Sequence, residues 1–378
     1  MVLRDGGEVS LTRTEVRLLL WFAERTGRAL PREALLTEVW GYAPGVESRA
    51  PDNTIARLRT KIEADPKHPE HLLKVYGVGY RFEYTPAEAD VEEAEAAPDA
   101  PTDASDEPRV GLDLFREQAR RVRWDFALTP AEVPVVEALI QGPLAGEPLA
   151  VTLAASQAGR LTTLEIAERL TEHLQLAATR DPVDGTLGWC RGLLAPAERA
   201  AMAQCAVFRA SFTLEAAEAV LDLSRWPDLW TLDVLQTLRD QALLVLDGDD
   251  LSAPGAPPRF ALLPPLQAPA LADLRGGGAY DGAVRRHLRW HAALAEAALG
   301  ADDAALQAAL KATKPDLTAA VTRALSLADP DLADATGWCY LGLAAGLTAD
   351  EQRPELRDEI LTLVGLSDAL CVRLSALD

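Results

Sequence analysis

Apolar residues near the start of the chain recur every three or four positions, which is the spacing of helices that bury one face. Three helices are predicted in this way: one after Thr14 that ends at Gly27, one opened by Pro31 and one started by Pro51. Their apolar faces are formed by Val16, Leu19, Leu20 and Ala23, by Leu35, Leu36, Val39 and Trp40, and by Ile55, Leu58 and Ile62.

Short apolar segments that contain glycines lie before and after these helices. Residues 73–84 predict two strands joined near Gly77 and Gly79, a hairpin with permissive glycines at its tip. Residues 1–11 have room for two more strands. A polar loop from Gly41 to Glu47 separates the second helix from the third. On the third helix the side chains expected to face outward are Arg57, Arg59 and Lys61.

The order of these elements resembles the OmpR/PhoB family of winged-helix transcriptional regulators over roughly residues 1–86. Three motifs in the right order and spacing carry the resemblance. They are Leu30-Pro31-Arg32-Glu33-Ala34-Leu35-Leu36 leading to Val39-Trp40-Gly41, then Ile55-x-Arg57-Leu58-Arg59-x-Lys61-Ile62, and finally Gly77-x-Gly79-Tyr80-Arg81-Phe82. The resemblance implies a domain that binds double-stranded DNA, and a contact of the loop from Gly41 to Glu47 with RNA polymerase.

A helix can read DNA because the major groove of B-DNA admits one helix, whose side chains reach base edges while basic residues neutralise phosphates. Arg57 and Arg59 are the best candidates, and Asp52 could accept a hydrogen bond from a cytosine amine. The alternative is that the basic side chains only solvate an exposed helix face. The resemblance favours contact and implies a wider set of DNA-binding residues, with Trp40 at the DNA backbone: Trp40, Arg49, Asp52, Thr54, Arg57, Arg59, Lys61, Lys74, Tyr76 and Tyr80.

Two positions depart from the family pattern. Ala56 occupies a position on the third helix that is commonly basic, and Tyr76 stands in the wing where the family often has an arginine. Because each departure removes a cation from the expected DNA-facing surface, the affinity is expected to be modest.

Charge divides the chain into two parts. The full 378 residues carry a net charge of −21, but residues 1–86 hold 13 Lys and Arg against 12 Asp and Glu. Residues 87–108 hold nine acidic residues and no basic one. Low hydrophobicity with one sign of charge cannot bury a core, so this segment is predicted to be a disordered linker. A sharper hypothesis is that the linker competes with DNA for the basic helix.

Cysteine usage and hydropathy exclude several classes of protein. The four cysteines are far apart and lack Cys-x-x-Cys spacing, which predicts buried free thiols rather than a zinc site or a disulfide framework. No basic start followed by an apolar run indicates a signal peptide. The longest uncharged stretch, residues 335–349, is too short to span a bilayer. The chain is expected to be soluble and cytoplasmic, without a membrane partner.

From about Gly111 onward, leucine- and alanine-rich segments with helical periodicity predict an all-α region. The helices expected last along the chain resemble tetratricopeptide helices, with Trp338 and Tyr340 packed between them. Such stacks leave a concave face for a protein partner or for self-association. Helices are expected at residues 131–140, 148–156, 164–176, 283–299, 306–327 with a break at Pro315, and 332–347.

Residues 131–345 resemble the helical arm that follows the nucleotide-binding core in STAND-type regulators, which include the large ATP-binding LuxR and AfsR-like proteins. The resemblance rests on residues 186–194, 195–199 and 206–217, and it implies a degenerate second winged helix at residues 234–263. A Gly-x-x-x-x-Gly-Lys-Ser/Thr phosphate loop is missing, so a remnant without ATP binding is expected, and no cofactor. Pro264, Pro265 and Pro269 argue against the helix that the relatives have there.

His287 and His291 are four residues apart, a spacing that puts both on one helix face and is found in metal sites. The pattern contains neither a third ligand nor a nearby carboxylate, so no metal site is predicted.

The predicted fold is mainly α with a small β component. It comprises a winged helix at residues 1–86, the acidic linker at 87–108, a helical and degenerate winged-helix region at 109–275, and tetratricopeptide-like helices at 276–378. The favoured function is a sequence-specific transcriptional regulator whose helical region senses or dimerises. The alternative is a protein–protein adaptor whose winged helix no longer binds DNA, which Ala56, Tyr76 and the net charge favour. No enzyme is predicted, because no nucleophile, base and orienting group form a recognisable motif.

Overall fold

The structure is a computed structural model that describes residues 2–4, 7–9, 11–40, 50–75, 78–84, 110–123, 126–177, 179–247, 258–345 and 353–377. The predicted linker, the loop from Gly41 to Glu47, Arg49 and Tyr76 lie outside the described residues. The chain splits into two compact units, Met1–Thr186 and Leu187–Gly248 with Pro258–Asp378. The predicted domain boundaries at residues 86, 108 and 275 stay predictions.

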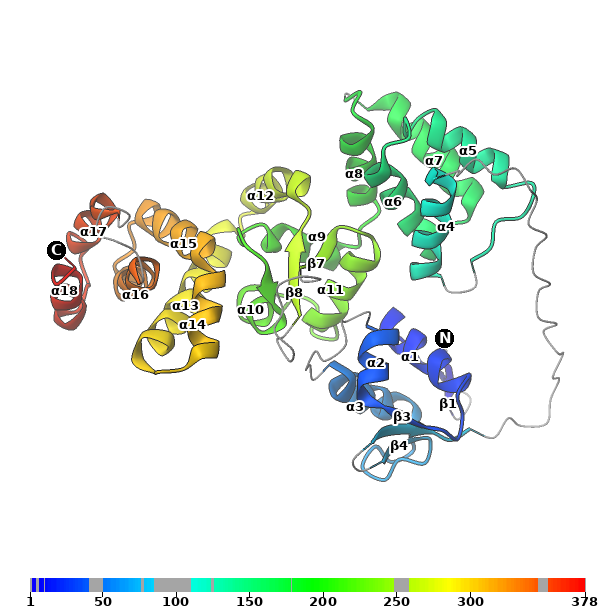
Figure 1. Cartoon of the computed structure of the whole chain (residues 1–378), viewed down its shortest axis with the longest axis horizontal. Coiled ribbons are helices and arrows are strands. Elements are labelled where there is room, and N and C mark those ends of the chain that lie inside the picture. Colours follow the sequence, from blue (N-terminus) through cyan, green and yellow to red (C-terminus); the bar gives the residue numbers. More distant parts are fainter. Residues whose placement is uncertain are drawn as a thin grey trace. The chain divides into compact units, whose positions relative to one another are not determined.

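The first unit begins with a winged helix (Figure 1). Its helices and strands are α1 (Arg13–Ala23), β3 (Ala29–Pro31), α2 (Arg32–Glu38), α3 (Ala50–Ile62), β4 (Leu72–Val75) and β5 (Gly79–Phe82). The strands form one antiparallel sheet in the order β3-β5-β4, and β1 (Val2–Arg4) and β2 (Gly7–Val9) form a separate hairpin. The three predicted helices, the wing hairpin and the two strands at the start of the chain are confirmed. The motif analysis missed β3, in which Pro31 pairs with Gly79 before α2 begins.

Helix α1 buries a different face from the one its apolar spacing predicted. Leu18 and Phe22 are fully buried together with Glu15, whereas Val16 and Leu20 keep 37% and 42% of their surface exposed. The reason is that Glu15 closes a capping box with Thr12, accepting a hydrogen bond from the Thr12 N–H at 2.8 Å. A charged residue therefore occupies the inward face, and counting apolar residues alone assigned the wrong side.

Gly79 lies where the wing meets the first strand of the sheet. A Cβ at this position would lie 2.2 Å from the carbonyl oxygen of Leu30 and 2.8 Å from the nitrogen of Arg32. Only a residue without a side chain permits this close approach of two backbones. The glycine thus allows the start of β5 to lie directly against the end of β3 and the start of α2.

The rest of the first unit is helical. Its helices are α4 (Val110–Val122), α5 (Val133–Gln141), α6 (Pro148–Ser156), α7 (Thr163–Leu176) and the start of α8 (Pro182–Gly192). The three helices predicted in this stretch are confirmed. Helix α7 begins where the sequence indicated, because the Thr162 hydroxyl and the Glu165 carboxylate form a reciprocal capping box.

The second unit repeats the winged-helix order of elements. It runs α9 (Pro196–Cys205), β6 (Phe212–Thr213), α10 (Leu214–Val220), α11 (Thr231–Asp240), β7 (Leu244–Asp247) and β8 (Arg259–Leu262). Its sheet has the order β6-β8-β7, which matches β3-β5-β4 in the first unit. The predicted degenerate winged helix is therefore confirmed as a fold. Helix α11 takes the position that α3 has in the first unit. It carries two acidic residues, Asp233 and Asp240, and one basic residue, Arg239, and most of its length is buried.

The helix that three prolines argued against is present, so that expectation is wrong. Pro264 and Pro265 begin a short 3-10 turn, and Pro269 is the third residue of α12 (Gln267–Gly276). The first turn of a helix has N–H groups without an intrahelical acceptor. Proline at these positions therefore removes no hydrogen bond.

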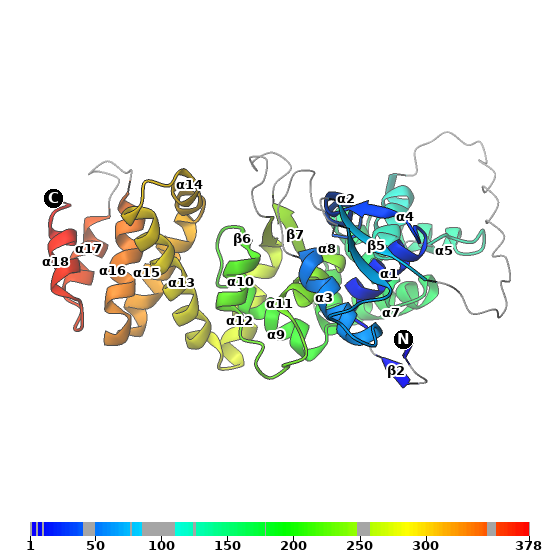
Figure 2. The ribbon, with the colours of Figure 1, turned by 90° about the horizontal axis from the view of Figure 1, so that it is seen from below.

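The chain continues in the second unit as a stack of helices, shown from yellow to red in Figures 1 and 2. They are α13 (Tyr280–Gly300), α14 (Ala304–Ala312), α15 (Lys314–Leu327), α16 (Ala333–Ala344), α17 (Pro354–Leu361) and α18 (Asp368–Ser375). The predicted break near Pro315 is confirmed at Thr313. Tyr340 is fully buried and Trp338 packs against the same core. Among the described helices, none is both long and apolar enough to cross a membrane.

All four cysteines are free, as expected. Cys190, Cys205 and Cys339 are buried, and Cys371 is half-buried. Burial raises the pKa of the Cys205 thiol to about 12, so this group packs as a small apolar side chain and is not a reactive thiolate at neutral pH.

Candidate nucleic-acid interface

Helix α3 presents one polar face to solvent. Asn53, Ala56 and Thr60 are exposed and Arg57 is half-exposed, and these positions repeat at the three- and four-residue spacing of one helix face. The opposite face, which includes Ile55 and Leu58, is buried in the domain. The exposed face is therefore short and carries a single arginine, Arg57, beside two polar side chains and one alanine.

Arg59 turns toward the wing and not outward. Its guanidinium donates to the carbonyl oxygen of Leu72 at 2.9 Å. The N–H of the same residue, Leu72, donates to the carboxylate of Glu63 at 2.7 Å, just beyond the end of α3. Two side chains from the end of α3 therefore hold both polar groups of Leu72. This clamp fixes the position of β4 relative to the helix.

Lys61 also turns inward. Its ammonium group lies 2.7 Å from the buried carboxylate of Glu15 on α1. The expectation that all three basic side chains of α3 face outward is thus wrong for Arg59 and Lys61. The physical reason is that two buried or backbone acceptors, the Glu15 carboxylate and the Leu72 carbonyl, need partners and lie within reach of those positions. Whether Arg59 and Lys61 contact DNA stays a prediction.

Asp52 joins the first turn of α3 to α2 and to the wing. One carboxylate oxygen accepts from the Tyr80 hydroxyl at 2.6 Å, and the other accepts from the Arg32 guanidinium at 2.9 Å. Burial alone would raise the pKa of Asp52, but these two hydrogen bonds and the charge of Arg32 hold it below its ordinary value. Burial and the adjacent carboxylate raise the pKa of Tyr80 to about 12. Asp52 is therefore an ionised, oriented acceptor.

Oδ2 of Asp52 accepts two hydrogen bonds from the Arg32 guanidinium, so only Oδ1, which accepts from Tyr80, has a lone pair left for a further hydrogen bond. The predicted contact with a cytosine amine is compatible with this arrangement and stays a prediction. Lys74 on β4 is exposed, and its charge also lowers the pKa of Asp52. The carboxylate and this ammonium group are thus within electrostatic range of each other.

Two predicted contact residues are fully buried. The indole of Trp40 and the side chain of Thr54 have no exposed surface. A buried side chain cannot reach DNA without a rearrangement of the domain, so their burial supports a structural role. The predicted site residues that the structure describes therefore fall into three groups: exposed side chains, side chains that bond within the domain, and fully buried side chains.

Sequence reasoning missed four residues. Asn53 and Thr60 lie on the exposed face of α3, while Arg32 and Glu63 hold the surrounding geometry. The first pair could have been found from helical spacing, by extending the face of Arg57 three and four positions in each direction. The second pair gives no local signal, because their partners lie 20 and 9 residues away in sequence.

The fold and this surface define a winged helix whose third helix carries the exposed polar face. Residues 6–82 match the family described as "Transcriptional regulatory protein, C terminal". The chain is 48% identical over 82 residues to the transcriptional regulatory protein KdpE of Mycobacterium tuberculosis, in strains CDC 1551 and H37Rv. This alignment covers 22% of the chain and 36% of each relative, so the chain spans about a third of the length of the curated relatives it matches.

Proposed function

We propose that the protein is a sequence-specific DNA-binding transcriptional regulator that reads DNA through α3. The observation that carries the proposal is the exposed face of α3, which places Arg57 beside Asn53 and Thr60 on the side of the helix that the domain leaves uncovered. A helix of this kind fits the major groove, where arginine bonds to guanine and asparagine bonds to adenine. The match of residues 6–82 to a transcriptional regulator family supports the same function.

Selection of bound sequences from random duplex DNA by the full chain tests this function. We expect enrichment of one motif over a few rounds. Parallel selections with Asn53→Ala and Arg57→Ala should lose preference at different base pairs, because each side chain would read its own base. Recovery of unselected sequence from the wild-type chain would contradict sequence-specific binding.

Arg57→Ala is expected to lower the affinity for the selected site by about 1–3 kcal/mol, or roughly 5- to 150-fold. The reason is the loss of a base contact. Arg121→Ala is the matched control, because this arginine is 67% exposed on α4, outside the winged helix. Fluorescence anisotropy at fixed salt measures both. An Arg57→Ala chain that binds like wild type would remove Arg57 from the interface.

The function of the helical region is the finer part of the proposal. We infer that residues 109–275 are a remnant of a STAND-type arm, and that the helical region as a whole senses a signal or dimerises. The repeat of the winged-helix order in the second unit supports this inference. Helix α11 offers no basic outward face, so the region is proposed to bind protein, with DNA left to α3. A contact of the loop from Gly41 to Glu47 with RNA polymerase is part of the same proposal.

An adaptor that binds protein through its winged helix is the second candidate. Ala56 on the exposed face of α3 and the inward turn of Arg59 and Lys61 favour it, because they leave few cations on that face. The two candidates separate in the DNA selection described above. A chain that selects no sequence but retains a protein partner at α3 would be an adaptor.

The acidic linker is expected to weaken DNA binding. We propose that its nine carboxylates compete with DNA for the cationic face, since a disordered chain of this length, which the composition predicts, has a root-mean-square reach of roughly 25 Å. Replacing the acidic residues of 87–108 by Asn and Gln should tighten binding to a single half-site at low salt. The gain should shrink as salt rises, because exposed charges are screened.

The control for the linker is a chain with the same residues of 87–108 in permuted order, which should bind like wild type because its charge is unchanged. Both chains are compared on one half-site so that dimerisation does not contribute. Equal affinity of neutralised and wild-type chains at low salt would rule out this competition.

A further inference from the structure

A buried cluster of two histidines and one aspartate joins helices α13 and α15 in the second unit. His287, His291 and Asp316 are all fully or almost fully buried. One ligand atom from each lies within 4.8 Å of the others. The helical spacing of the two histidines was visible in the sequence, but the carboxylate comes from another helix, 25 residues after His291. The structure therefore supplies the third group that the sequence pattern lacked.

The geometry of the cluster fits a metal ion. Nε2 of His287 lies 3.1 Å from Oδ1 of Asp316. In a tetrahedral site with metal–ligand distances of about 2.0–2.2 Å, neighbouring ligand atoms are about 3.3 Å apart. The observed pair thus matches one edge of such a site. The two imidazole centroids are 4.3 Å apart, so both rings border the same space.

The hydrogen bonds around the cluster prepare its ligands. Nδ1 of His291 faces the carbonyl oxygen of His287 at 2.8 Å, so Nδ1 carries the hydrogen and Nε2 keeps its lone pair. Metal-binding histidines usually donate the N–H of the ring nitrogen that does not bind the metal in this way. Asp316 is oriented by two backbone N–H groups, those of Arg209 at 2.6 Å and Ala210 at 3.1 Å. Nδ1 of His287 is buried and has no hydrogen-bond partner among the described residues.

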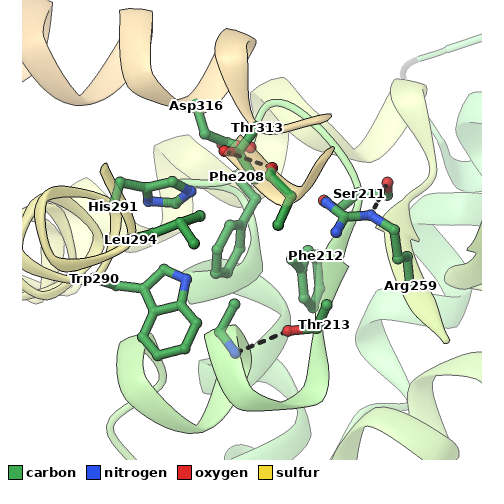
Figure 3. A pocket seen from close by; sticks show the side chains of 12 residues that line it. Phe208, Ser211, Phe212, Thr213, Arg259, Trp290, His291, Leu294, Thr313 and Asp316 are labelled. Atoms are coloured by element: carbon green, nitrogen blue, oxygen red, sulfur yellow. Dashed lines mark hydrogen bonds between the residues drawn. The ribbon is translucent and has the colours of Figure 1, made fainter. Parts of the chain in front are cut away.

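A pocket gives access to the cluster. His291 and Asp316 line it together with Phe208, Trp290 and Arg259, as Figure 3 shows.

We propose that His287, His291 and Asp316 bind a divalent transition-metal ion of the zinc type, with a fourth position open to the pocket. Imidazole and carboxylate together select such ions, whereas magnesium and calcium require mostly oxygen ligands. Arg259 lines the same pocket and opposes a bound cation electrostatically, so binding should depend on strong nitrogen ligation.

The proposed ion would connect three parts of the second unit. It would link α13 to α15 directly. Through the bonds of Asp316 to the N–H groups of Arg209 and Ala210, it would also link both helices to the loop between α9 and β6. Metal binding should thus stabilise the second unit and make its stability depend on the concentration of the metal ion. This goes beyond the proposed DNA binding and does not depend on it.

Titration of the chelator-treated full chain with Zn²⁺ by calorimetry, and with Co²⁺ by visible absorption, tests the site. One ion per chain is expected, with the strong visible bands of tetrahedral Co²⁺. His291→Gln and His287→Gln should each weaken binding by at least about tenfold. His68→Gln is the matched control, because His68 forms a surface pair with Asp65 at 2.7 Å and its side chain is 85% exposed.

Thermal unfolding separates loss of a ligand from loss of the fold. Without metal, the His291→Gln chain should unfold close to the wild-type temperature, because His291 does not bond to Asp316. Zn²⁺ should raise the unfolding temperature of the wild-type and His68→Gln chains, and raise that of His291→Gln less at the same Zn²⁺ concentration. Absence of Zn²⁺ binding by the wild-type chain, or binding that survives both substitutions in the cluster, would overturn the proposal.

Discussion

Glu63→Ala is expected to destabilise the winged helix by about 3 kcal/mol or more. The Glu63 side chain is almost fully buried, and its carboxylate accepts from three backbone N–H groups, those of Glu70, His71 and Leu72, at 2.7 to 3.0 Å. Alanine removes all three hydrogen bonds, of which the one from Leu72 is buried, and a hydrogen bond to a charged group contributes about 1.5–3 kcal/mol. Few other single changes in the described part of this domain would remove as many bonds.

Hydrogen exchange of the segment at residues 59–75 measures the effect locally, which avoids the problem that a chain of several units does not unfold in two states. Glu70→Ala is the control, because Glu70 is exposed and contributes only its backbone to the cluster. Glu63→Gln should fall between, since the amide keeps one acceptor oxygen and loses the charge. Unchanged protection in Glu63→Ala would show that water replaces the carboxylate without cost.

The same substitution should weaken DNA binding indirectly. Glu63 and Arg59 hold the two polar groups of Leu72, so they fix β4 against the end of α3. When this clamp is broken, the helix and the wing can no longer be presented to DNA in one fixed geometry. Loss of affinity should therefore accompany loss of stability in Glu63→Ala.

Local patterns were sufficient for most of the winged helix. The three helices and the wing follow from apolar spacing, proline, glycine and capping residues, which act over four residues or fewer. The orientation of α1 was the exception. Thr12 and Glu15 form a capping box and Lys61 arrives from α3, so the helix buries a carboxylate. Periodicity of apolar residues cannot reveal a buried charge whose partner is 46 residues away.

The candidate site was predictable only in part, for the same reason. Helical spacing predicts which residues share a face with Arg57, but Tyr80 and Arg32 reach Asp52 from other elements. The side chains of Arg59 and Lys61 were assigned to solvent because nothing in the local sequence shows the acceptors that draw them inward. The cluster at His287 was missed in a similar way, since Asp316 lies on α15 and its two amide donors follow α9.

Asp316→Ala is expected to destabilise the second unit by about 3–5 kcal/mol in metal-free protein. Burial alone would raise the pKa of Asp316, but the hydrogen bond from His287 and the donors around it hold the pKa below its ordinary value. The carboxylate is therefore ionised at neutral pH and bonded to three donors, those of His287, Arg209 and Ala210. Its removal leaves all three donors without this acceptor, the buried His287 imidazole among them.

The loss should appear as faster hydrogen exchange at residues 205–216 and 284–291, measured with a chelator present so that no bound ion contributes. These segments hold the loop between α9 and β6 and the turn of α13 that bears His287. Asp302→Ala, an exposed aspartate in the same unit, is the control and should leave exchange unchanged. Asp316→Asn should retain part of the protection, because its carbonyl still accepts from one amide. Wild-type protection in Asp316→Ala would mean that the loop is held by the packing of Phe208 against the His287 and His291 rings and not by the carboxylate.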